Sequence, residues 1–168
     1  MSSDIKQVFL DQFAACHDEP NWFVPLNKVL DGLTVEQAMW KESRNTNSIW
    51  QIVSHLSFWN ERYLQRFKEE PVEETKIESN DDTFTYNAEE TVQGWERAVE
   101  KANNVMLEWR KAIAEADEDK LTQGVRSGTN DLWSKTLANI IIHNAYHIGQ
   151  ILQIRKQQGS WDPKNGVH

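Results

Sequence analysis

The stretch SKTLANIIIHNAYHIGQILQIRKQQ, from Ser134 to Gln158, decides the fold of this chain. Its apolar residues recur every three or four positions, which is the period of an α-helix with one buried face. Gly159 is expected to end the helix, because glycine favours the position after a helical C-terminus. The stretch therefore predicts a helix over 134–158 that packs against other helices. Its wide apolar arc comprises Leu137, Ile140, Ile141, Ala145, Ile148, Ile151, Leu152 and Ile154.

Three other long segments have the same apolar period, and they predict helices over 3–17, 47–68 and 87–116. Signals for β-strands are weak, because no long alternation of apolar and polar residues occurs. Four long helices without a sheet must bury their apolar faces against one another, so the predicted fold is all-α, a four-helix bundle. The connection over 69–86 is long enough to cross one end of the bundle. A single domain over 1–168 is expected from the length.

Short sequence patterns predict two short helices and the residues that cap the long ones. A short helix over 22–30 would bring Trp22 to an apolar face and end at Gly32, and a further turn is expected at Thr34, which forms a capping-box pair with Gln37. The expected helix caps are Asn47 or Ser48 for 47–68, and Asn87 with Glu90 for 87–116.

Composition limits the classes of function. The chain has 168 residues and a net charge of −8, which argues against nucleic-acid binding. No segment has the length and apolarity of a membrane span, and the first residues lack the pattern of a signal peptide. Cys16 is the single cysteine, so no internal disulfide can form, and a cytoplasmic location is expected.

The negative charge is concentrated in one segment. Residues 69–82 contain seven acidic residues and one lysine, so the rest of the chain carries only −2. A segment so polar cannot supply apolar surface to a core, and we expect it to form a solvated loop.

Three histidines occupy helical positions that favour metal binding. His143 and His147 are four residues apart, so both imidazoles lie on one face of the predicted helix, one turn apart. Both fall within about 60° of Ile140 around the helix, at the buried arc. His55 lies at the edge of another apolar stripe, between Ile52 and Trp59. Neutral imidazole suits zinc and similar divalent ions. The alternative is that each ring hydrogen-bonds to a neighbouring helix.

Other chemistry has weaker support in the sequence. A di-iron site needs Glu-x-x-His on two helices, and this motif does not occur. Cys16 and His17 are adjacent, so their side chains would point about 100° apart on a helix. Cys16 is therefore expected to be a small core residue. Asn144 and Gln150, which neighbour the histidines, are expected mainly in packing or at the surface, with orientation of a ligand as the alternative.

Two histidine motifs resemble those of the DinB/YfiT-like superfamily. SIWQIVSHLSFWN, Ser48 to Asn60, resembles its His-Leu-x-x-Trp helix, and HNAYHIGQI, His143 to Ile151, closely resembles its second histidine motif. The resemblance implies an up-down-down-up four-helix bundle that binds one divalent ion, nickel or zinc, through His55, His143 and His147. In the maleylpyruvate isomerase branch of that family the middle ligand is a glutamate, so His143 makes that branch a poorer match.

The resemblance also bears on function. Relatives include thiol S-transferases that use bacillithiol or mycothiol, some relatives are induced by DNA damage, and many form dimers. A three-histidine centre leaves positions open for a metal-bound water or thiol. We therefore expect a metal-dependent enzyme for thiol S-transfer or hydrolysis, with a low-molecular-weight thiol and a small electrophile as partners, and a homodimer. The alternative is a non-catalytic metal-binding protein of a stress response.

Overall fold

The structure is a computed structural model, and it describes residues 2–72, 75–86, 89–117, 119–126 and 129–166. The described part of the chain is helical and contains no β-strand beyond an isolated bridge between Gly124 and Leu132. None of the described helices is both long and apolar enough to cross a membrane. The α-helices are α1 (Ser2–His17), α2 (Leu26–Leu30), α3 (Val35–Met39), α4 (Ile49–Phe67), α5 (Val92–Glu115) and α6 (Trp133–Gln157).

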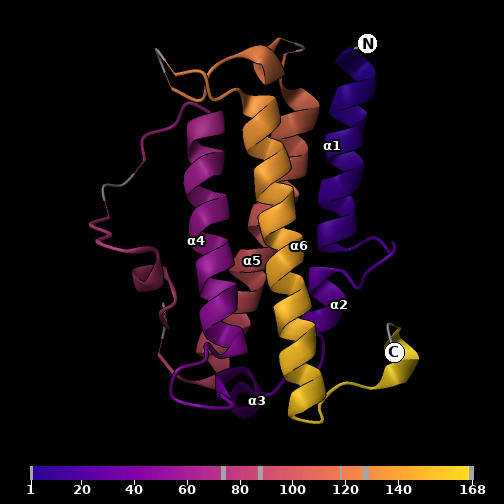
Figure 1. Ribbon diagram of the computed structural model, residues 1–168, viewed down its shortest axis with the longest axis vertical. Helices are drawn as coiled ribbons and strands as arrows, with labels where there is room; N and C mark the ends of the chain where they lie inside the picture. Colours follow the sequence, from indigo (N-terminus) through magenta and orange to yellow (C-terminus); the bar gives the residue numbers. More distant parts are fainter. Residues whose placement is uncertain (1, 73–74, 87–88, 118, 127–128, 167–168) are drawn as a thin grey trace.

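The four long helices form a bundle with the expected order of directions. In Figure 1, α1 and α6 run downwards, whereas α4 and α5 run upwards. This confirms the up-down-down-up arrangement. Because α4 and α5 are parallel and pack against each other, the chain between them must return along the length of the bundle. We call this connection, residues 68–91, the crossover.

Local capping explains where several helices begin. The Ser48 hydroxyl accepts a hydrogen bond from the Gln51 backbone N–H, and the Gln51 side chain accepts one from the Ser48 backbone N–H, so this pair forms a capping box at α4. Thr34 and Gln37 form the predicted capping box at α3. Helix α5 is different. Thr91 caps it, so it starts at Val92 and not at 87, and the expected cap, Asn87, lies outside the described residues.

The expectation of a helix that begins at residue 22 was wrong. Helix α2 begins at Leu26 and not at 22, because Pro25 disfavours helical geometry at the residue before it. Trp22 is therefore outside the helix and is 98% exposed.

Large aromatic side chains fill the space between the helices. Trp50, Trp109 and Trp133 are fully buried, and Trp109 stacks on Phe13 with ring centroids 5.5 Å apart. Phe67 at the end of α4 contacts both Trp109 and Trp133. The two sides of the bundle are thus joined by aromatic packing, which fixes the separation of α4 and α6.

The crossover is more ordered than a solvated loop. The described acidic residues of its first half, Glu69, Glu70 and Glu78, are exposed, but Asn80–Thr83 forms a 3-10 helix that packs on α4. The Asp82 carboxylate accepts hydrogen bonds from the backbone N–H groups of Glu78 and Ser79, which stabilises this turn. Thr83 is buried as a result. The last residues of the expected loop over 69–82 are exposed, as expected, but they form an ordered turn because the Asp82 carboxylate satisfies backbone N–H groups.

Candidate metal centre

The three histidines expected to act together lie side by side. His55 extends from α4, and His143 and His147 extend from successive turns of α6. The Nε2 atom of His143 lies 2.9 Å from Nε2 of His55 and 3.1 Å from Nε2 of His147. His55 and His147 are buried, and His143 is partly exposed. Three imidazole nitrogens from two helices thus converge on one point.

The outer nitrogen of His55 is held by the crossover. The Thr83 hydroxyl donates its one proton to the Asn80 carbonyl oxygen, at 2.6 Å. Its oxygen must therefore accept the hydrogen bond that joins it to His55 Nδ1. This requires the proton of His55 to be on Nδ1, so Nε2 presents a lone pair to the centre.

The outer nitrogen of His147 is held in the same way by its own helix. Nδ1 of His147 lies 2.7 Å from the amide oxygen of Gln150, which can only accept, so the proton is again on Nδ1. The Gln150 amide nitrogen donates to the Tyr146 hydroxyl, and this fixes the orientation of the amide. Gln150 therefore orients an imidazole. The sequence favours packing or a surface position for this residue, with orientation of a ligand as the alternative. Carbonyl and hydroxyl partners of this kind are typical behind metal-ligating histidines.

These tautomers leave the centre rich in lone pairs. Two of the three Nε2 atoms can only accept, and one proton on His143 Nε2 cannot form a well-directed hydrogen bond to both of them. A cation would satisfy all three nitrogens at once. Three neutral imidazoles are a donor set that zinc and similar divalent ions accept. The residues present therefore fit a divalent metal ion.

Electrostatics favour the neutral form that a ligand needs. Burial, followed by the charges of His147 and His143, lowers the pKa of His55 to about 3. Burial, followed by the charge of His147, lowers the pKa of His143 to about 4. Burial also lowers the pKa of His147, against the hydrogen bond with Gln150. All three imidazoles are thus neutral at pH 7, as metal ligation requires.

The crossover also covers the centre. The Phe84 ring stacks on His55 with a centroid distance of 3.9 Å and an interplanar angle of 6°. Phe84 and Thr83 are functional residues that sequence reasoning missed. The signal available was the Phe84 and Tyr86 pair of aromatic residues that directly follows the acidic run.

A buried amide pair joins the two helices beside the histidines. Asn60 on α4 and Asn144 on α6 exchange side-chain hydrogen bonds of 2.7 and 3.1 Å. Both side chains are buried, and Asn144 directly follows His143. Two satisfied amides in an apolar core fix one relative position of α4 and α6, since any slip would leave buried polar groups unpaired. The pair thus helps to set the distance between His55 and His143.

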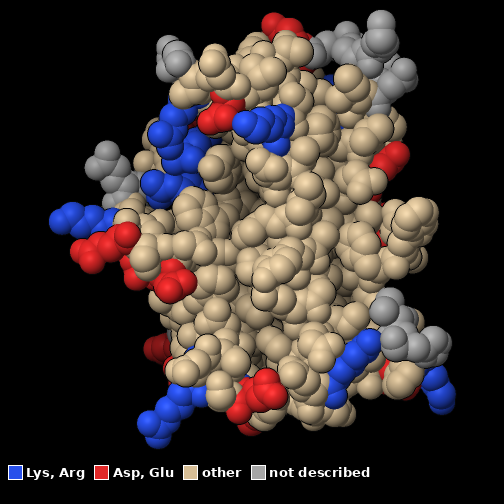
Figure 2. Space-filling view, viewed as in Figure 1, with Lys and Arg blue, Asp and Glu red and all other residues tan. Residues whose placement is uncertain are grey.

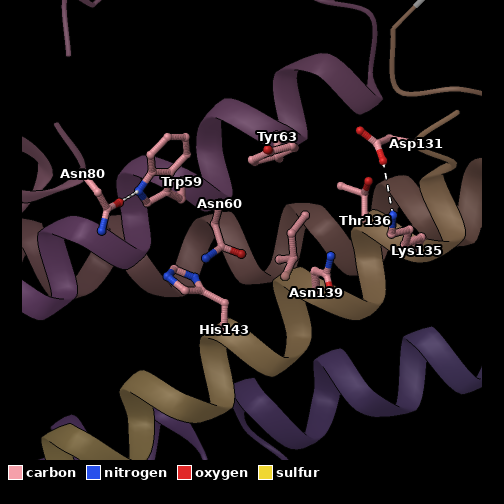
Figure 3. Close-up of a pocket in the computed structure, with 10 residues that line it drawn as sticks. Trp59, Asn60, Tyr63, Asn80, Asp131, Lys135, Thr136, Asn139 and His143 are labelled. Atoms are coloured by element: carbon pink, nitrogen blue, oxygen red, sulfur yellow. Dashed lines mark hydrogen bonds and ion pairs between the residues drawn. The ribbon is translucent and has the colours of Figure 1, made fainter. Parts of the chain in front are cut away.

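A cavity of about 480 Å³ opens beside the centre. Figure 3 shows His143 at one end of the cavity and Asp131 with Lys135 at the other. Trp59 and Tyr63 of α4 form an aromatic wall between these ends. The volume is in the range of small-molecule sites.

Cys16 does not take part in this site. It is fully buried, and burial raises the pKa of its thiol to about 12. Its neighbour His17 interacts with Asn103. Cys16 is a core residue, as expected.

The fold and the site together define the class of this protein. It is an up-down-down-up helical bundle in which three histidines from the second and fourth long helices could hold a metal ion. The family model for the DinB superfamily matches residues 25–151, and the chain belongs to this superfamily. The resemblance seen in the two histidine motifs is thereby confirmed. No curated protein and no solved structure gives a significant match to the chain.

Proposed function

We propose that this protein is a metal-dependent enzyme in which His55, His143 and His147 hold one divalent ion, nickel or zinc. The observation that carries the proposal is the convergence of three Nε2 atoms at one end of a cavity. A divalent ion with three protein ligands keeps an open position and lowers the pKa of a water or thiol bound there. Thiol S-transfer and hydrolysis are the reactions that this chemistry serves.

The residues of the chain have separate roles in this proposal. Thr83 and Gln150 hold the protonated outer nitrogens, so the lone pairs of His55 and His147 stay directed at the ion. Phe84 excludes water from one face of His55. Trp59 and Tyr63 provide the apolar wall against which a small electrophile packs next to a low-molecular-weight thiol. A homodimer and a cytoplasmic location stay predictions from the sequence.

Metal content tests the first half of the proposal. Protein purified without a histidine tag and loaded with zinc or nickel should hold one ion per chain by elemental analysis. His55→Ala, His143→Ala and His147→Ala should each lose most of the ion. His17→Gln is the matched control, because it removes a histidine that pairs with Asn103 and is not in the cluster. A folded wild-type protein that refuses both metals would refute the centre.

Activity of the loaded protein tests the second half. Zinc- and nickel-loaded samples are assayed with a low-molecular-weight thiol plus chlorodinitrobenzene, and separately with an activated ester. We expect turnover by one of these reactions that is lost on chelation and in His143→Ala. One ion per chain with no turnover of either kind would favour the alternative, a non-catalytic metal-binding protein.

A further inference from the structure

The end of the cavity remote from the histidines is bordered by positive charge. Lys135 of α6 lines it, and the guanidinium of Arg66 lies 5.0 Å from the ring centroid of Tyr63, which lines it from α4. Arg126, from the connection before α6, is close enough for its charge to act on Arg66. Figure 2 shows Lys and Arg side chains gathered at the upper left, beside the hollow between α4 and α6. We call Arg66, Arg126 and Lys135 the basic rim.

This concentration of charge is unusual for the chain. The net charge is −8, yet one cation, Lys135, lines the cavity and a second, Arg66, lies against its wall residue Tyr63. Burial, and then the charge of Arg126, lower the pKa of Arg66, with Arg62 acting in the same direction. Within the part of the chain that the structure describes, Arg66 and Arg126 have no carboxylate at ion-pair distance. Because these two guanidinium groups have no such partner, they create a positive potential that attracts an anion.

One carboxylate does face the rim. Asp131 lies 3.4 Å from Lys135, and both side chains are 68% exposed. An ion pair that is this exposed contributes little, about 0–1 kcal/mol, so Lys135 remains able to exchange partners. Asp131 therefore reduces the positive charge of the rim without cancelling it.

Helix geometry gives the distance between the rim and the histidines. Lys135 precedes His143 by eight residues, and Tyr63, on which Arg66 lies, follows His55 by eight residues. Eight helical residues span about 12 Å. Because α4 and α6 are antiparallel, both displacements lead to the same end of the cavity (Figures 1 and 3). Lys135 thus lies roughly two helical turns from His143, and Arg66 roughly three turns from His55.

We infer that the cavity takes an elongated small molecule whose reactive end lies at the three histidines and whose other end carries an oxyanion, a carboxylate or a phosphate, bound by Arg66, Arg126 and Lys135. This inference rests on the proposed function for the reactive end only. Guanidinium groups suit oxyanions because their N–H donors match two oxygens at once. The aromatic wall of Trp59 and Tyr63 would contact the apolar middle of the molecule.

The test compares two thiol probes that differ at the end remote from the thiol, which is a carboxylate in one and a neutral alcohol in the other. Binding of ω-mercapto-octanoic acid and of ω-mercapto-octanol to the zinc-loaded protein is measured by isothermal titration calorimetry. We expect the acid to bind about tenfold or more tightly, as one or two hydrogen bonds between ionised groups would give. The corresponding ω-mercapto-octyl phosphate shows which oxyanion the rim prefers. Equal affinities of the acid and the alcohol, or an acid that does not bind at millimolar concentration, would overturn the inference.

Variants assign the preference to the rim. In Arg66→Gln/Arg126→Gln the acid should bind no more tightly than the alcohol, while the affinity for the alcohol is unchanged. Arg97→Gln on α5 removes the same type of charge from an exposed position and should keep the preference. A preference that survives the double variant, or is lost equally in Arg97→Gln, would contradict the assignment. The comparison of probes on the wild-type protein does not depend on any variant folding.

A metal-free arm separates this inference from the proposed function. If the chain holds no metal, both probes lose their contact with the ion and the proposed function fails. The rim would still bind the carboxylate, so in metal-free protein the acid should remain the tighter ligand. Loss of the preference in that sample would count against the basic rim itself.

Discussion

The hydrogen bond behind His55 offers the sharpest test of how the centre is built. Thr83→Val keeps the shape of the side chain but removes the hydroxyl that accepts from His55 Nδ1 and donates to the Asn80 carbonyl. His55 is 1% exposed, so water cannot replace the lost partner. A buried donor without an acceptor costs about 1–3 kcal/mol. His55 can avoid this cost by moving its proton to Nε2, but then it no longer presents a lone pair to the centre.

Thr83→Val should therefore lower stability and metal affinity together. We expect the free energy of unfolding of the metal-free protein to fall by about 1–3 kcal/mol in urea denaturation. Zinc affinity, measured by competition with a chromogenic chelator, should fall about 10- to 100-fold, as is usual when a partner behind a ligating histidine is lost. Thr83→Ser is the control, since it keeps the hydroxyl. Wild-type affinity in Thr83→Val, alongside lost binding in His55→Ala, would refute the tautomer argument.

Three further predictions concern Gln150, pH and Cys16. Gln150→Leu should lower zinc affinity about tenfold in the same competition assay, whereas Gln150→Glu, which still accepts from His147, should retain it; equal losses in both variants would contradict this. In metal-free protein the folded-state pKa values of His55 and His143 lie below the unfolded value of about 6.5. As the pH is lowered, the unfolded chain therefore takes up protons before the folded one, and the free energy of unfolding decreases. Urea denaturation should show a loss of about 2 kcal/mol per histidine near pH 5, with a smaller loss in His143→Gln, and unchanged stability would oppose the pKa argument. Cys16 should react with a thiol reagent only after unfolding, and prompt labelling of the native protein would show that it is not buried.

Most of the fold could be predicted because its signals are local. The apolar period predicted α1, α4 and α6 close to their observed bounds, and the capping residues Thr34 and Ser48 predicted the starts of α3 and α4. The start of α5 was wrong because several polar residues before it can cap a helix, and only packing selects Thr91. Trp22 was placed in a helix because an aromatic residue at helical spacing resembles a core position until Pro25 is considered.

The candidate centre could be predicted only in part. The histidines follow from helical phase and from the family motifs, since both depend on regular spacing. Thr83 and Phe84 could not be assigned, because their contacts with His55 depend on the path of the crossover in space. The pairing of Asn60 with Asn144 joins residues 84 positions apart, and no local pattern indicates it. Whether residues 1–168 form one independent domain stays a prediction.

The helices hold the three histidines and the crossover covers them, and this separation affects which substitutions the protein can accept. The three histidines belong to helices held by aromatic packing and by the Asn60–Asn144 pair, where substitution of a buried residue disturbs the core. The residues that cover His55 belong to a connection in which most of the described residues before Asn80 are exposed, and exposed loop residues usually tolerate substitution. Mutations that accumulate in the crossover can therefore alter which molecules reach the histidines while their spacing is preserved. For an engineer who seeks a new substrate, the exposed residues of the crossover are the ones to randomise, with Thr83 and Phe84 kept.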